Sequence, residues 1–168
     1  MLSVSRTPDG VCMKRVTSGN QYAFRVSLKR RKSIWRTVVL RGDQTLDDLH
    51  ETIFTAFDRD DEHLYSFYFP NAAARRSQRG AQFREYAAPY GFEPEALTSD
   101  GRYNAAAVRL DDLKLKEGQT FEYLFDFGDE WWHEIKVEAL GASDRTKAYP
   151  QIVDKRGASP AQYPEVDE

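Results

Sequence analysis

The sequence predicts an α+β fold in two layers, with one main helix packed on a four- to five-stranded, mostly antiparallel or mixed sheet. Residues 121–138 and residues 22–40 both alternate apolar and polar side chains. A period of two residues is typical of strands with one buried face. Between residues 46 and 57, apolar side chains recur at helical spacing, which predicts the helix. The order of these elements favours a β-grasp-like topology.

The segment 121–138 predicts a hairpin that anchors the core. One face of each arm is aromatic or apolar and is formed by Phe121, Tyr123, Phe125 and Phe127, then by Trp131, His133, Ile135 and Val137. Gly128-Asp129 separates the arms and predicts the turn, because glycine reaches positive φ and aspartate bonds nearby backbone amides.

Residues 22–28 and 34–40 predict a second hairpin with a basic linker at residues 29–33. Residues 1–41 carry ten Lys or Arg and one Asp, whereas residues 110–139 carry nine Asp or Glu and three Lys. We interpret this asymmetry as basic and acidic strands that lie side by side, since opposite charges across strands stabilise pairing. A nucleic-acid contact is the alternative interpretation.

The helix begins near Leu46, because Thr45 and Asp48 have the spacing of a capping box. A third strand is predicted over residues 63–69, where Tyr65, Phe67 and Phe69 share a face.

We expect a single domain over residues 21–140, with an irregular insert at 71–107 that is rich in Arg, Pro and Gly. Residues 1–20 are predicted to be a weakly structured N-terminal extension, and residues 141–168 an extended C-terminal tail. Cys12 is the one cysteine, so no intrachain disulfide is expected. No apolar run approaches the roughly 20 residues of a membrane span, so we expect a cytoplasmic protein without a membrane partner.

Short motifs follow one another in a specific order along residues 22–140. They are Phe24-Arg25-Val26, Ile34-Trp35-Arg36, Thr45-Leu46, Leu49-His50, His63-Leu64-Tyr65-Ser66-Phe67, Leu110-Asp111-Asp112-Leu113, and Tyr123 to Asp129 followed by Trp131 to Glu134. Together they resemble the plasmid pRiA4b ORF-3-like family, whose members often carry names such as insertion-element passenger protein. The resemblance implies a compact α+β domain of uncharacterised biochemical activity that is associated with plasmids or mobile elements.

Five residues are candidates for a catalytic or metal-dependent site, namely His50, His63, Asp126, Asp129 and His133. Imidazole and carboxylate groups could together hold a divalent metal or form an acid/base pair, which gives the alternative of a hydrolase. The sequence has no H-E-x-x-H or H-x-H pair, so we favour histidines that bond carbonyls or carboxylates in a structural role. On that interpretation we expect no metal and no cofactor.

A binding surface is predicted on the sheet face that carries Trp132. The alternation of its strand places this side chain on the face opposite the inward residues. Tryptophan is enriched in binding hot spots. Two basic groups could contact a partner, and they comprise Lys29, Arg30, Arg31 and Lys32, then Arg75, Arg76, Arg79 and Arg84.

Our leading hypothesis is a non-enzymatic binding or accessory protein, because the sequence is rich in core and turn signals and poor in catalytic ones. Its partner would be an unknown protein or nucleic acid. The second alternative, besides the hydrolase, is a nucleic-acid-binding protein that uses residues 29–32 and 75–84 along a phosphate backbone.

Overall fold

The computed structural model describes residues 19–71, 83–89 and 102–163 of the 168-residue chain. In this described part, eight strands accompany one α-helix and two short 3-10 helices. In chain order they are β1 (Asn20–Leu28), β2 (Arg31–Arg41), α1 (Leu46–Ala56), β3 (Tyr65–Pro70), β4 (Phe83–Ala87), β5 (Tyr103–Asn104), η2 (Ala105–Ala107), η3 (Leu110–Leu113), β6 (Thr120–Phe125), β7 (Trp131–Ala142) and β8 (Gln151–Arg156).

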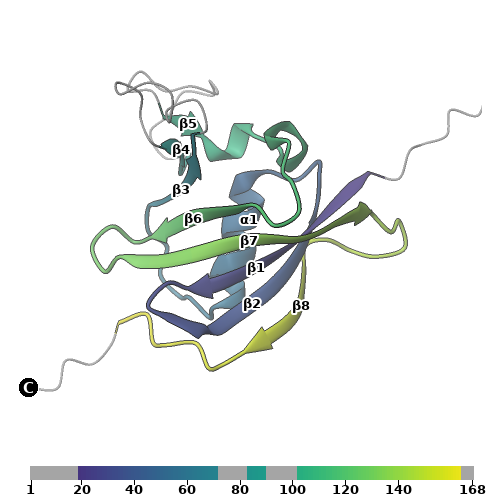
Figure 1. Cartoon of the computed structure of the whole chain (residues 1–168). Coiled ribbons are helices and arrows are strands. Elements are labelled where there is room, and N and C mark those ends of the chain that lie inside the picture. The colour runs from purple at the N-terminus through teal and green to yellow at the C-terminus, as the bar shows by residue number, and fades with distance from the viewer. Residues whose placement is uncertain (1–18, 72–82, 90–101, 164–168) are drawn as a thin grey trace, which may run out of the picture.

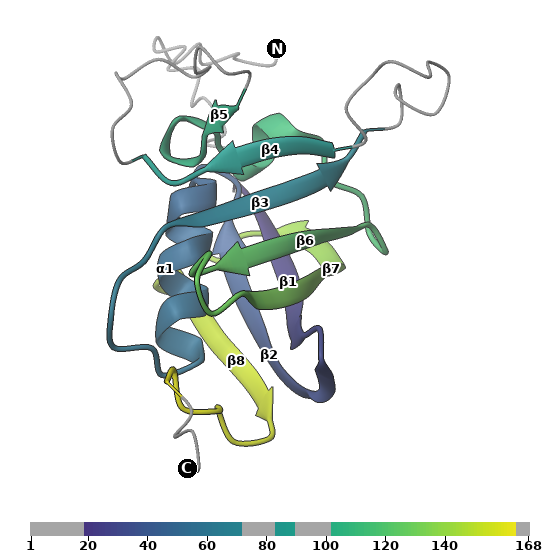
Figure 2. The same ribbon diagram turned by 90° about the vertical axis from the view of Figure 1, so that its left-hand side faces the viewer.

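All eight strands form one mixed sheet in the order β5-β4-β3-β6-β7-β1-β2-β8. β4 and β5 are parallel, and the other neighbouring strands are antiparallel. The sheet twists strongly, because β3 and β4 run across the view of Figure 2 whereas β1, β2 and β8 run steeply down it. The helix α1 lies behind β6, β7 and β1 in Figure 1 and covers one face of the sheet.

The predicted fold class is wrong, because the structure is an eight-stranded mixed sheet with one α-helix rather than a helix on four or five strands in a β-grasp-like order. Three strands were missed. β4 and β5 come from the segment expected as an insert, and β8 comes from the segment expected as a tail. The six residues of β8 are mostly exposed and half of them are charged, so this edge strand has no alternating apolar face.

The hairpin of β6 and β7 is confirmed, but its turn differs from the prediction. The turn spans Asp126 to Glu130, and the Glu130 amide donates to the Asp126 carbonyl at 2.7 Å. Positive φ values occur at Asp126 (61°) and Glu130 (53°) rather than at Gly128. The left-handed backbone at Asp126 breaks the alternation of β6. Phe127 is therefore 42% exposed. The prediction that it lies on the core face of the hairpin is wrong.

The predicted start of α1 is confirmed. The Thr45 hydroxyl accepts from the Asp48 amide at 3.2 Å, and the Asp48 carboxylate accepts from the Thr45 amide at 2.7 Å. These two bonds satisfy donors that the first turn of a helix leaves free. Across the described ranges, no helix has the length and apolarity that a bilayer crossing requires.

The charge asymmetry arises from neighbouring strands, as predicted. β1 lies between β2 and β7, and β7 pairs with β6. Three ion pairs join basic residues of β1, β2 and the turn between them to glutamates of β6 and β7, namely Arg25–Glu138 at 2.7 Å, Lys29–Glu122 at 2.5 Å and Lys32–Glu134 at 3.2 Å.

The core lies between α1 and the inward face of the sheet. Phe121 at its centre stacks on Phe69 with ring centroids 4.2 Å apart and meets Phe24 edge-on at 6.0 Å. Leu46, Leu49 and Ile53 of α1 are buried against this aromatic layer. Aromatic burial of this extent dominates the stability of a domain of this size.

Candidate functional site

The three histidines surround two neighbouring aromatic side chains of β6. The rings of His50 and His133 lie 6.0 and 5.1 Å from the ring of Tyr123, and His63 lies 6.0 Å from the ring of Phe125. Their polar atoms nevertheless have different neighbours.

His50, on α1, is 2% exposed and stacks on Tyr65 at 3.8 Å. Its Nδ1 lies 2.7 Å from the Tyr123 hydroxyl, and its Nε2 lies 3.3 Å from a Glu62 carboxylate oxygen. Burial lowers the pKa of His50 to about 3, so the ring is neutral and carries one proton. A carboxylate only accepts, so Nε2 donates to Glu62 and Nδ1 accepts from Tyr123.

This tautomer bears on whether His50 could hold a metal. One ring nitrogen of His50 and the carboxylates of Glu51 and Glu62 offer ligand atoms that all lie within 4.8 Å of one another. A metal on Nε2 would need the lone pair of that nitrogen, whose proton instead bonds Glu62. Burial, followed by neighbouring acids, raises the pKa of both Glu51 and Glu62. The hydrogen bonds of His50 are thus satisfied by protein groups, and this set of residues fits a metal poorly.

His63 lies at the molecular surface near the hairpin turn. Its Nε2 is 2.8 Å from the Tyr163 hydroxyl and 3.6 Å from an Asp126 carboxylate oxygen. The other oxygen of Asp126 accepts from the amides of Gly128 at 2.9 Å and Asp129 at 3.4 Å. Asp126 therefore closes the turn of its own hairpin, and its contact with His63 is secondary.

His133, on β7, is 1% exposed between the rings of Phe57 and Tyr123, each 5.1 Å away. Neither ring nitrogen makes a well-formed hydrogen bond with any residue that the structure describes. Burial, with a further contribution from the positive charge of Arg59, lowers the pKa of His133 to about 3. The nearby carbonyls of Trp131 and Tyr123 oppose this fall only weakly.

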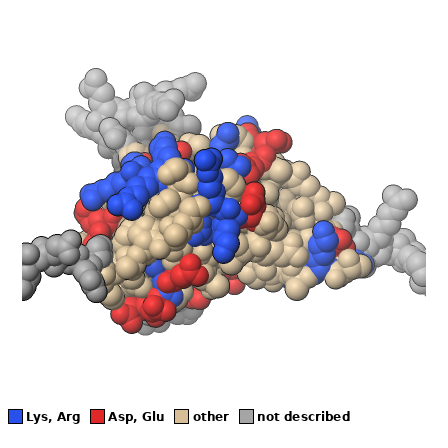
Figure 3. All heavy atoms as spheres, turned by 90° about the horizontal axis from the view of Figure 1, so that it is seen from below, with Lys and Arg blue, Asp and Glu red and all other residues tan. Residues whose placement is uncertain are grey.

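A groove lies between the β1–β2 turn and the β6–β7 turn, and its volume is about 470 Å³. Apolar, basic and acidic side chains line it, and they are Leu28, Arg30, Arg31, Asp129, Glu130, Trp131, Trp132, Pro160 and Ala161. Figure 3 shows this end of the molecule from below, where Lys and Arg side chains gather beside Asp and Glu. Of the five catalytic candidates, Asp129 is the one that lines this groove.

The basic residues predicted to bind a partner differ in their availability. Lys29 and Lys32 are paired with glutamates, whereas Arg30 and Arg31 are exposed and form no ion pair within the described ranges. Trp132 is half-buried, with Tyr68 at 5.5 Å and the Lys29 ammonium at 5.3 Å from its ring. Arg75, Arg76 and Arg79 lie outside the described residues, and Arg84 lies over Tyr103 at 5.5 Å.

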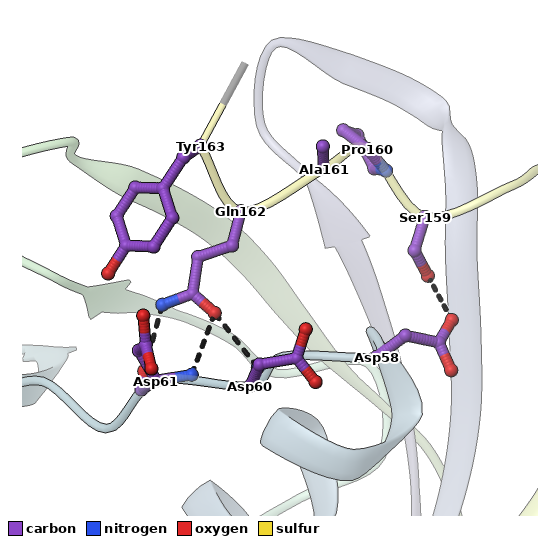
Figure 4. Close-up of a pocket in the computed structure, with 8 residues that line it drawn as sticks. All are labelled: Asp58, Asp60, Asp61, Ser159, Pro160, Ala161, Gln162 and Tyr163. Atoms are coloured by element: carbon purple, nitrogen blue, oxygen red, sulfur yellow. Dashed lines mark hydrogen bonds between the residues drawn. The ribbon is translucent and has the colours of Figure 1, made fainter. Parts of the chain in front are cut away.

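A second hollow of about 350 Å³ lies where residues 159–163 cross the end of α1. Figure 4 shows the Gln162 side chain pointing at the backbone of Asp60 and Asp61. Its carbonyl oxygen accepts from these two amides at 2.9 and 3.2 Å, and its amide nitrogen donates to the Asp61 carbonyl at 2.8 Å. The backbone carbonyl of Gln162 accepts from the Trp131 indole at 3.2 Å.

Arg59 is the residue of this region that sequence reasoning missed. It is 6% exposed, and its guanidinium lies 4.0 Å above the ring of Trp131. In the sequence it stands within the acidic run Asp58 to Glu62, which is typical of a solvated helix end. The one feature of the sequence that distinguishes Arg59 is its place among four acidic residues, and this feature does not predict that its side chain is buried.

The chain is similar to proteins whose function is unknown. Residues 20–163 match the family model described as plasmid pRiA4b ORF-3-like protein. The chain is 28% identical over 128 residues to the uncharacterized protein y4hQ of Sinorhizobium fredii (strain NBRC 101917 / NGR234), and this match covers 76% of the chain and 57% of that protein. It therefore spans little more than half the length of this curated relative.

A solved structure has the same fold. The crystal structure of MM3350, a protein of unknown function from Methanosarcina mazei Go1, matches with a TM-score of 0.68 at 23% identity. The match covers 86% of this chain and 73% of that one. Because the family model covers most of the sequence, including every described strand, the chain belongs to the plasmid pRiA4b ORF-3-like protein family.

Proposed function

We propose that the chain is a non-enzymatic binding module, an accessory to proteins encoded on plasmids or other mobile elements, and that its partner is an acidic, extended protein segment. One observation carries the proposal. In the groove between the two turns, Arg30 and Arg31 have no ion pair among the described residues and stand beside Trp131 and Trp132.

The lining of the groove supports a protein ligand. Tryptophan provides a large contact area at little cost in conformational entropy, and it is enriched in binding hot spots. An arginine guanidinium matches a carboxylate through two parallel hydrogen bonds. The volume of about 470 Å³ is enough for a few side chains of a bound segment.

The charges of the groove disfavour a nucleic acid. Asp129 and Glu130 line the same groove as the two arginines, so the groove offers no continuous basic track for a phosphate backbone. Lys29 and Lys32, which could have extended a basic track, are engaged by Glu122 and Glu134. A segment that carries both acidic and apolar side chains complements this mixed surface better than a uniform row of phosphates.

The geometry gives the hydrolase alternative little support. The described candidates do not meet around one cleft, since His133 is enclosed, His50 bonds Tyr123 and Glu62, and the contact between His63 and Asp126 lies beside the turn. An acid/base mechanism needs such groups within hydrogen-bond reach of a common substrate position.

The test is fluorescence anisotropy with a fluorescein-labelled dodecapeptide in which glutamate and leucine alternate. We expect the double variant Arg30→Ala/Arg31→Ala to weaken binding about tenfold or more, since two charge-assisted contacts are lost. The matched control Lys116→Ala/Lys155→Ala removes two exposed positive charges away from the groove and should change affinity less than threefold.

Two outcomes would contradict the proposal. One is equal loss of affinity in the arginine variant and the control, which would mean that net charge alone attracts the peptide. The other is tighter binding of a 20-base-pair DNA duplex than of the peptide, with the strong decrease on added salt that phosphate contacts produce.

A further inference from the structure

Arg59 has a pair of hydrogen-bond donors that no acceptor meets. Its Nη1 donates to the Pro160 carbonyl at 3.4 Å, whereas Nε and Nη2 are buried without a partner among the residues that the structure describes. The Nε–H and Nη2–H groups lie on the same edge of the planar guanidinium. This edge pairs with both oxygens of a carboxylate in a bidentate contact.

Leaving these donors unpaired is costly. A buried polar group without a partner loses the hydrogen bonds that it makes to water, and the loss is larger for a charged group. Burial lowers the pKa of Arg59, and the negative charge of the neighbouring Asp58 opposes this in part, but Asp58 forms no hydrogen bond to Nε or Nη2. Its Oδ2 accepts instead from the Ser159 hydroxyl at 2.8 Å. His133, whose ring nitrogens likewise make no well-formed hydrogen bond within the described ranges, lies close enough for the charge of Arg59 to lower its pKa.

The segment Gly157–Tyr163, which we call the strap, covers this place. It forms no strand, and side-chain contacts hold most of its length: Ser159 with Asp58 and Arg36, Gln162 with Asp60 and Asp61, and Tyr163 with His63. Its own contact with Arg59, through the Pro160 carbonyl at 3.4 Å, is long for a charge-assisted hydrogen bond.

The covered place adjoins the groove. Trp131 lines the groove and also lies against the Arg59 guanidinium, 4.0 Å from it. Pro160 and Ala161 of the strap line the groove and the hollow of Figure 4 alike. Displacement of the strap, which contacts Arg59 through the Pro160 carbonyl, would therefore open a path from the groove toward the guanidinium.

We propose that the strap covers a carboxylate pocket, and that a Glu or Asp side chain of the partner segment enters it and pairs with the Nε and Nη2 edge of Arg59. This inference rests on the proposed function and names the anchor of the bound segment. A carboxylate is favoured over a phosphate because Asp58, Asp60 and Asp61 line the adjoining hollow. These acids repel a phosphate, which carries up to two negative charges, more strongly than a carboxylate with one.

Two variants test the roles of Arg59 and of the strap separately, with the same labelled dodecapeptide as the probe. Arg59→Lys keeps a positive charge but cannot form a bidentate contact, so we expect affinity to fall about tenfold or more. Gln162→Ala removes the side-chain bonds to Asp60 and Asp61, which are part of what holds the strap, and should tighten binding about threefold to tenfold, because the open state becomes more populated. The matched controls Arg156→Lys and Gln151→Ala, on the exposed strand β8, should leave affinity unchanged.

A second measurement reports on the strap itself. Amide hydrogen exchange of Ala161, Gln162 and Tyr163 should become faster when the unlabelled peptide is bound. Unchanged affinity in Arg59→Lys and Gln162→Ala, together with a loss in Arg30→Ala/Arg31→Ala, would overturn the pocket and leave the groove standing. No binding to the wild type or to Gln162→Ala would overturn both. Tighter binding of a peptide with phosphoserine in place of glutamate would overturn the choice of a carboxylate.

Discussion

Tyr123 and His133 lie opposite each other on β6 and β7, with ring centroids 5.1 Å apart in the interior of the protein. The hydroxyl of the same tyrosine lies 2.7 Å from Nδ1 of His50. Burial is the main cause that lowers the pKa of both histidines from 6.5 to about 3. Both histidines therefore remain neutral in the folded protein at pH values where the unfolded chain takes up protons.

Stability should consequently fall as the pH falls below about 6.5. Between pH 6.5 and 3 the unfolded state binds more protons than the folded state, so each histidine lowers the free energy of unfolding by about 1.4 kcal/mol per pH unit. Above pH 6.5 both states are neutral at these positions, and the contribution disappears. Urea unfolding at pH 7, 6 and 5 measures this slope. A free energy of unfolding that stays constant over that range would contradict the assignment.

The variant His133→Phe should remove about half of this pH dependence. It should change the free energy of unfolding at pH 7 by less than about 1.5 kcal/mol, because His133 makes no well-formed hydrogen bond that the change could break. His50→Phe is the matched comparison. It removes the partners of Tyr123 and Glu62 and should destabilise the protein by about 1–3 kcal/mol. Equal effects of the two variants at pH 7 would show that His133 has a partner.

The sequence predicted the central strands because their apolar side chains alternate, and it predicted α1 because Thr45 and Asp48 cap it. β8 escaped prediction because an edge strand needs only backbone pairing with β2, and its side chains face water. The exposure of Phe127 also escaped prediction, since the left-handed backbone of Asp126 interrupts a pattern that continues in the sequence.

The groove was predictable in part. The alternation of β7 indicated that Trp132 lies on the outer face, and the linker between β1 and β2 indicated a basic turn. The pairing of Lys29 and Lys32, which leaves Arg30 and Arg31 available, depends on the register of strands far apart in the sequence. Arg59 was not predictable, because its burial depends on a strap about one hundred residues further along the chain.

The cap of α1 gives a local test of stability. Thr45→Ala removes the acceptor of the Asp48 amide and should lower the free energy of unfolding by about 1 kcal/mol. Thr55→Ala, at an exposed position near the other end of α1, is the control and should change it by less than about 0.5 kcal/mol. Thermal unfolding followed by circular dichroism measures both. A loss in the control as large as that in Thr45→Ala would attribute the effect to helix propensity rather than to capping.

Two phenylalanines of the β6 arm provide the sharpest test of the backbone break at Asp126. Phe121 is 1% exposed and contacts the rings of Phe24, Phe67 and Phe69, whereas Phe127 is 42% exposed. Phe121→Ala should lower the free energy of unfolding by about 3–5 kcal/mol, because it leaves a cavity in the aromatic core. Phe127→Ala should change it by less than about 0.5 kcal/mol. Continuous alternation through residue 127 would instead make both substitutions strongly destabilising, and urea unfolding at pH 7 distinguishes the two cases.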